Sequence, residues 1–140
     1  MTEVDEKFMR EALREAHMAE DEDEIPIGAG STFAGRVIAK GHNMTERLHD
    51  PTAHAEMIAI TAATEAMGGK YLNDCTLYVT VEPCPMCAGA IINGRMRKIF
   101  YGARDEAMGA CGGVLNLFME DFPCKPQIFG NILGEESREI

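Results

Sequence analysis

The sequence predicts a layered α/β sandwich built around one central sheet. Segments with helical periodicity alternate with runs of β-branched and aromatic residues, a pattern typical of helices packed on a sheet. The chain has 140 residues, 46% of them hydrophobic and 26% charged, which suits a globular domain with its own core. We find no internal repeat, linker or low-complexity segment, and therefore expect residues 1–140 to form a single domain.

The first half of the chain predicts one helix and two strands. Residues 3–19 place apolar side chains on one helical face, and the acidic run 20–24 that follows predicts a solvated loop. Residues 30–33 read as a weak strand because glycine and small polar residues dominate it. Residues 36–40 form a better strand, and Ala34-Gly35 suits the turn between the two.

The second half predicts further helices and strands in alternation. Asp50-Pro51 is typical of a helix start, and we expect that helix to end at Gly68-Gly69. Residues 76–81 are the clearest strand, and Cys84-Pro85 opens a helix that ends at Asn93-Gly94. The remaining predictions are a strand at 98–101, a short helix at 114–119 and a last strand at 127–129.

Composition excludes some classes of protein. No apolar run approaches the ~20 residues of a membrane span, and the polar first residues predict no signal peptide. We therefore expect no membrane contact and a cytoplasmic location. Five cysteines, an odd number, argue against a disulfide framework and indicate metal binding or reactivity. The formal charge of −10 should repel nucleic acid at long range, although a local basic patch can still bind phosphate.

Three candidate zinc ligands stand at predicted helix starts. His54 follows the Asp50-Pro51 signal, while Cys84 and Cys87 are two residues apart, so both sulfurs can face one point. A helix N-terminus lowers thiol pKa values and so favours the thiolate that binds metal. Three protein ligands are typical of catalytic zinc sites, in which water takes the fourth position. A closed structural zinc site and a thioredoxin-like redox pair are the alternative interpretations of Cys84 and Cys87.

Glu56 is the candidate proton shuttle. It points about 200° around the helix from His54, so it is poorly placed as a ligand but can line the same cavity. A carboxylate there can move protons while zinc lowers the pKa of water towards ~7. His54-x-Glu56 with Pro83-Cys84-x-x-Cys87 is the signature of zinc nucleobase deaminases.

Longer segments carry a more specific resemblance, which covers roughly residues 8–137. The chain resembles the bacterial tRNA adenosine deaminases. The resemblance implies a cytidine-deaminase-like three-layer α/β/α sandwich with a five-stranded mixed sheet, bound Zn²⁺ and a homodimer. It also implies conversion of adenosine to inosine at the wobble position, in a tRNA anticodon loop, with release of ammonia. The matching segments are Pro26–Ala29, Gly41–Asn43, His49–Glu56, Leu77–Cys84, Met86–Ala90 and Gly102–Asp105.

The same resemblance implies roles for individual residues. Glu56 would be the proton donor, Asn43 would hydrogen-bond the purine, and the Ala55 backbone N–H would contact its ring. Ile25 would offer an apolar wall beside the flipped base, and Asp105 would lie near the nucleotide sugar. The alternatives without substrate contact are a turn residue for Asn43, a core residue for Ile25 and a loop cap for Asp105.

Some features depart from the family pattern. The first strand, Gly30–Phe33, is usually an apolar run, so this edge of the sheet is expected to be altered. Residues 134–140 predict the opening of a helix that continues further in the family, where it helps to hold the anticodon. The charge of −10 is unusual for an RNA-binding protein. The cations that could contact phosphate form only one local cluster, which consists of Arg95, Arg97, Lys98 and Arg104.

Two other functions remain open at this stage. Guanine deaminases share the His-Asp-Pro-Thr-Ala-His-Ala-Glu type of segment and a Cys-Pro-Met-Cys, so the alternative substrate is a free base, guanine before cytosine. A non-catalytic, zinc-stabilised interaction module is the remaining alternative, and it predicts a fourth protein ligand.

Overall fold

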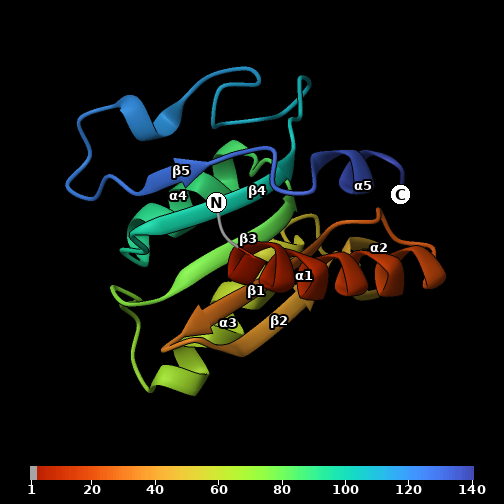
Figure 1. Ribbon diagram of the computed structural model, residues 1–140, viewed down its shortest axis with the longest axis horizontal. Helices are drawn as coiled ribbons and strands as arrows, with labels where there is room; N and C mark the ends of the chain where they lie inside the picture. The colour runs from red at the N-terminus through yellow and green to blue at the C-terminus, as the bar shows by residue number, and fades with distance from the viewer. Residues whose placement is uncertain (1–2) are drawn as a thin grey trace.

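The computed structural model describes residues 3–140 and is built on a mixed five-stranded sheet (Figure 1). The strand order is β2-β1-β3-β4-β5, in which β1 pairs antiparallel with β2 and β3, and β3, β4 and β5 are parallel. The predicted α/β sandwich with a five-stranded mixed sheet is confirmed. The strands are β1 Gly28–Phe33, β2 Arg36–His42, β3 Thr76–Val81, β4 Lys98–Ala103 and β5 Gln127–Phe129.

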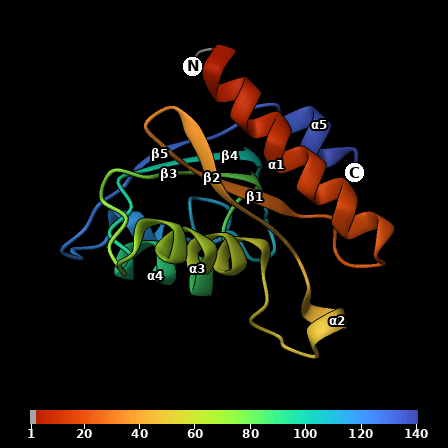
Figure 2. The same ribbon diagram turned by 90° about the horizontal axis from the view of Figure 1, so that it is seen from below.

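Helices cover both faces of this sheet (Figure 2). Helices α1, Glu3–Asp21, and α5, Gly134–Arg138, lie on one face, and α3, Ala55–Met67, and α4, Pro85–Asn93, lie on the other. Separate apolar clusters fill the two layers, the larger one under α3 and α4. Two short elements, α2 at Thr45–Leu48 and the 3₁₀ helix η1 at Leu117–Met119, lie in the connections. Within residues 3–140, no helix is both long and apolar enough to cross a bilayer.

The first strand is central and well formed, not an altered edge. β1 pairs on both sides, and all its residues but the last are buried. Ser31 is fully buried, and its Oγ is the one buried side-chain N or O atom within residues 3–140 that lacks a hydrogen-bond partner. The strand therefore forms despite its weak sequence because β2 and β3 satisfy its backbone and α1 and α3 bury its two faces.

Helix α3 starts four residues later than predicted, at Ala55 and not at Pro51. Asp50 does not cap a helix, because its Oδ1 accepts hydrogen bonds from Thr52 N, at 2.8 Å, and Thr52 Oγ1, at 2.7 Å. These bonds hold residues 50–52 in a turn, which a short polar side chain can stabilise as well as it can cap a helix. His54 is instead the N-cap residue of α3, and Gly68 ends the helix with φ 71° as predicted.

The last third of the chain is also less helical than predicted. The helix expected at 114–119 is wrong, since only η1 forms, with Asn116 Oδ1 accepting from Phe118 N at 3.1 Å. That local bond favours a single tight turn over a longer helix. The helix opening expected at 134–140 is present as α5.

A glycine allows β2 to approach α3 closely. A Cβ atom added at Gly41 would lie 2.7 Å from Ala55 O and 2.8 Å from Ala59 N. Any side chain at this position would push the first turn of α3 away from the sheet. Gly41 therefore helps to set where His54 and Glu56, at the start of α3, lie relative to β2.

The acidic run after α1 is folded into the structure, so the prediction of a solvated loop is wrong for most of it. Glu20 and Asp21 extend α1, and Glu24 is buried. The two carboxylate oxygens of Glu24 accept hydrogen bonds from Glu46 N, at 2.9 Å, and Arg47 N, at 2.8 Å. Glu24 thereby satisfies free backbone N–H groups in the first turn of α2, a helix that the sequence did not reveal.

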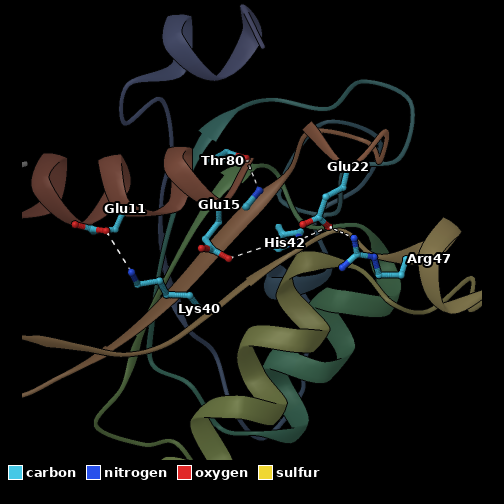
Figure 3. A network of polar contacts seen from close by, with 8 residues as sticks. Glu11, Glu15, Glu22, Lys40, His42, Arg47 and Thr80 are labelled. Atoms are coloured by element: carbon cyan, nitrogen blue, oxygen red, sulfur yellow. Dashed lines mark hydrogen bonds and ion pairs between the residues drawn. The ribbon is translucent and has the colours of Figure 1, made fainter. Parts of the chain in front are cut away.

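His42 joins α1 to the end of β2 through two carboxylates (Figure 3). Its Nδ1 lies 3.0 Å from Glu15 Oε1, and its Nε2 lies 3.0 Å from Glu22 Oε1. Burial disfavours the charged imidazolium, but the hydrogen bonds and charges of Glu15 and Glu22 outweigh it and raise the pKa of His42. Arg47 adds a longer contact to Glu22, at 3.7 Å.

The His42 network predicts a pH-dependent contribution to stability. Because the folded pKa is raised above the ordinary value of ~6.5, the contribution is full below that pH and is lost as pH rises through the folded pKa. We expect His42→Gln to destabilise the protein by about 1.5–3 kcal/mol at pH 5.5–6, and by progressively less at alkaline pH. Thermal or urea unfolding across this range measures the difference.

Lys40→Gln is the matched control for this prediction. Lys40 is half-exposed and makes a 3.6 Å pair with Glu11, so its loss should cost less than ~1 kcal/mol with little dependence on pH. A destabilisation by His42→Gln that stays constant from pH 5.5 to pH 9 would contradict the ion-pair interpretation.

Candidate functional site

Two helix N-termini meet at one end of the sheet and bring three ligand-type side chains together. His54 is the N-cap of α3, Cys84 is the N-cap of α4, and Cys87 lies one turn into α4. His54 Nδ1 lies 3.6 Å from Cys84 Sγ and 3.5 Å from Cys87 Sγ. Within residues 3–140, these three residues form the one cluster of such side chains close enough to hold a metal ion, with all ligand atoms within 4.8 Å of one another.

The spacing of these atoms fits zinc. Bonds of about 2.3 Å to sulfur and about 2.0–2.1 Å to nitrogen, at a tetrahedral angle, separate the two atoms by about 3.5 Å. The nitrogen–sulfur distances of 3.5 and 3.6 Å agree with that value. Two sulfurs and one imidazole are also a donor set that zinc prefers, and three ligands leave one tetrahedral position for water.

The two thiols differ in acidity because they interact with each other. A hydrogen bond from Cys87 and the backbone N–H groups at the start of α4 lower the pKa of Cys84 to about 5, despite burial. The same contact with the Cys84 sulfur, together with burial, raises the pKa of Cys87. A bound dication would let both sulfurs be thiolates, since its charge removes the repulsion between them.

Glu56 lies beside this cluster in the first turn of α3. Its side chain is only 4% exposed and contacts Cys87. Burial raises the pKa of Glu56 to about 7, with a further contribution from the Cys84 thiolate. A buried carboxyl group that titrates near neutrality can both accept and donate a proton.

Comparison with known proteins agrees with this geometry. The sequence model of the family described as "Cytidine and deoxycytidylate deaminase zinc-binding region" matches residues 2–103. The chain belongs to this deaminase family. The deaminase is therefore a zinc-dependent hydrolytic enzyme, and the fourth protein ligand predicted for a non-catalytic zinc module is absent from the cluster found within residues 3–140.

Two relatives show how far the similarity extends. The deaminase is 44% identical over 133 residues to the tRNA-specific adenosine deaminase of Bacillus subtilis, a match that covers 94% of this chain and 83% of that protein. It is 51% identical over 115 residues to the chloroplastic tRNA(adenine(34)) deaminase of Arabidopsis thaliana. That match covers 82% of this chain but spans only 9% of the longer plant protein.

Two solved structures are similar to the deaminase in both fold and sequence. A tRNA:A34 deaminase, studied for A-to-I editing at the wobble position of transfer RNA, superposes with a TM-score of 0.92 at 43% identity. The match covers 95% of this chain and 97% of that one. The guanine deaminase of Bacillus subtilis superposes with a TM-score of 0.71 at 38% identity, covering 85% and 74% of the two chains.

Backbone hydrogen bonds connect the segments that carry Ile25 and Asn43 to the residue before His54. Asn43 is buried, and its backbone N–H donates to Ile27 O at 3.1 Å. The following residue, Met44, donates to Ala53 O at 2.9 Å, directly before His54. Ile25 is 61% exposed, so the alternative that it is a core residue is wrong. Ala55 is the first residue of α3, where a helix leaves its N–H groups free to bind other acceptors.

Asp105, which the sequence analysis placed near the nucleotide sugar, opens a loop whose other residues were not assigned to the site. Its Oδ1 accepts hydrogen bonds from Ala107 N, at 3.0 Å, and Met108 N, at 3.1 Å, so the carboxylate does cap the loop. The loop, residues 105–113, returns to the ligand segment, where Ala110 N donates to Pro83 O at 2.8 Å.

Glu82 holds this loop and is a residue that the sequence analysis missed. Its side chain is nearly fully buried and accepts three backbone hydrogen bonds, from Asp105 N at 3.1 Å, Cys111 N at 2.6 Å and Gly113 N at 2.8 Å. A Cβ atom at Gly109 would lie 2.4 Å from the carboxylate, so the loop needs glycine there to reach it. The sequence signal that could have identified Glu82 is an acidic residue between a buried strand and Pro-Cys.

The predicted basic cluster is divided by the fold. Arg104 follows β4 and lies at the end of the sheet that holds the zinc ligands. Arg95, Arg97 and Lys98 lie at the opposite end, before and at the start of β4. The four cations therefore do not form one surface around the zinc ligands.

The Glu82 contacts predict a loop-specific effect of substitution. Glu82→Gln keeps the size of the side chain but turns an NH₂ group towards backbone N–H donors. We expect a loss of about 1.5–3 kcal/mol in the free energy of unfolding and faster hydrogen exchange at Cys111 and Gly113, with zinc content retained. Hydrogen-exchange mass spectrometry and metal analysis measure these effects.

Glu106→Gln makes the same chemical change at an exposed position in the same loop and should leave exchange unchanged. Unaltered exchange at Cys111 and Gly113 in Glu82→Gln would show that the carboxylate does not hold the loop.

Proposed function

We propose that the deaminase converts adenosine to inosine at the wobble position of a tRNA anticodon loop. The observation that carries the proposal is the match to the tRNA:A34 deaminase structure along almost the whole of both chains. The guanine deaminase of Bacillus subtilis is less similar in both backbone and sequence, which supports a nucleotide in RNA over a free base. The reaction consumes one water, releases one ammonia and leaves a carbonyl oxygen on the purine.

His54, Cys84 and Cys87 would hold the zinc, which would act as a Lewis acid and lower the pKa of a water at its open position. Glu56 would take a proton from the attacking water and deliver it to the ring nitrogen and then to the departing amino group. Its burial beside Cys87 supports this role, because a carboxyl group held away from bulk solvent passes its proton to the substrate.

Other residues would hold the purine for this transfer. The free N–H of Ala55 would donate to the ring, and the Asn43 side chain would hydrogen-bond the base. The exposed Ile25 would pack against the extruded base, and Asp105 would lie near the ribose. An anticodon loop presents unstacked bases, so extruding the base requires less free energy than it would from a duplex.

We also propose that the deaminase works in the cytoplasm as a homodimer. The Glu82-held loop and the segment that follows it expose five large apolar side chains, an unusual density for a surface that faces water. A second copy of the chain would cover them next to the site. They are Met108, Val114, Leu115, Met119 and Phe122.

Substrate choice is tested by ammonia release from three substrates under one set of conditions. We expect turnover of a stem-loop RNA carrying adenosine at the wobble position, and none of free guanine or free adenosine. Glu56→Gln should retain zinc and fold but lose at least ~10²-fold in rate, the usual scale for loss of a general acid–base group.

Turnover of guanine without turnover of RNA would reject the tRNA proposal in favour of a free-base enzyme. Full activity of zinc-loaded Glu56→Gln would reject the role of Glu56 but would not affect the proposed substrate.

The dimer proposal predicts a sedimentation mass of about twice 15.3 kDa at micromolar concentration. Met119, which is 77% exposed, is the most exposed of these apolar side chains, so Met119→Glu should shift the mass towards that of the monomer. A monomer for the unaltered protein at tens of micromolar would contradict the proposal.

A further inference from the structure

A second cavity lies at the end of the sheet opposite the zinc ligands. It has a volume of about 1060 Å³ and is formed by the start of β3 and β4, the end of α4 and the chain before β5. β4 runs six residues from this cavity to the zinc end, a separation of roughly 17–20 Å at strand spacing. The cavity is therefore distinct from the deamination site.

Three cations on this cavity have no acidic partner. Arg95, Arg97 and Lys98 line it and are exposed, and none of them forms an ion pair within residues 3–140. Lys125 also lines the cavity but pairs with Asp121 at 3.0 Å, and Asp74 adds one negative charge. In a chain with a formal charge of −10, three unpaired cations side by side indicate a site for an anion.

The backbone at Arg95 provides an independent indication. Arg95 has φ 58°, a left-handed conformation at the end of α4 where glycine is the favoured residue. Its side chain lies over the Tyr71 ring, 4.2 Å from the ring centroid. This contact offsets part of the backbone cost and holds the Arg95 guanidinium at the cavity.

The chemistry of the cavity matches a polynucleotide backbone. Guanidinium groups bind phosphate with paired N–H donors, and the Tyr71 ring holds the Arg95 guanidinium at the cavity. The amides of Asn73 and Gln127 add neutral donors and acceptors. We propose that this cavity binds phosphate groups of the RNA backbone, as a second contact beyond the deamination site.

This inference rests on the proposed function, because it takes RNA as the substrate. It explains how a chain with strong overall negative charge can bind RNA: repulsion from the acidic surface is offset where the unpaired cations meet the backbone.

Binding measurements on zinc-loaded protein carrying Glu56→Gln, which stops turnover, test the inference. We expect Arg95→Gln/Arg97→Gln/Lys98→Gln to bind an anticodon stem-loop RNA at least ~10-fold more weakly at ~0.1 M salt. The slope of log K against log salt should fall by about 2–3, for three lost phosphate contacts. Fluorescence anisotropy with labelled RNA measures both quantities.

The matched control removes three cations from elsewhere. Lys7→Gln/Arg10→Gln/Arg36→Gln changes the formal charge by the same three units at exposed positions on α1 and at the start of β2. It should leave both affinity and slope nearly unchanged. Equal weakening by the two triple variants, or no weakening by either, would overturn the inference.

Two further measurements separate the remaining outcomes. Arg95→Gly relieves the left-handed conformation, so it should keep the melting temperature and lower the salt slope by about 1; an unchanged slope would count against the site. Inorganic pyrophosphate that binds the cavity while RNA binding is insensitive to the triple variant would assign the cavity to a small anion instead. RNA that fails to bind the unaltered protein would reject the proposed function itself.

Discussion

The structure depends on the meeting of two helix N-termini at one end of the sheet. Helices α3 and α4 start there, and their N-cap residues, His54 and Cys84, face each other across the cluster. Only this arrangement brings one imidazole nitrogen to 3.5–3.6 Å from two sulfurs. The close approach at Gly41 and the loop held by Glu82 both serve to keep the helix starts and their surroundings in place.

Several acidic residues stabilise the fold of this protein by accepting hydrogen bonds. Glu24 binds the first turn of α2, Glu82 binds the loop beside the ligands, and Glu15 and Glu22 enclose His42. Each of these carboxylates accepts hydrogen bonds from N–H groups, which offsets the cost of burial. Part of the large negative charge therefore belongs to carboxylates that hold loops around the site, and not to the surface that faces solvent.

Some elements were predictable because their signals are local. A run rich in β-branched and aromatic residues predicted β3 with its observed ends, and Cys84-Pro85 with Gly94 predicted α4. Other predictions failed where a side chain could bond in two ways. Asp50 was expected to cap a helix but closes a turn, and β1 was expected to be a poor edge but is held inside the sheet by β2 and β3.

The amino-acid sequence by itself predicted the candidate zinc ligands, the adjacent carboxyl group and the α/β class, because these depend on residue type and short-range spacing. Only the tertiary structure decided which distant residues share a surface. It placed Glu82 against residues 105–113, exposed Ile25, and separated Arg95, Arg97 and Lys98 from the end of the sheet that holds His54. Such contacts join positions that are far apart in the chain. A local sequence pattern does not show which end of the sheet a residue will reach.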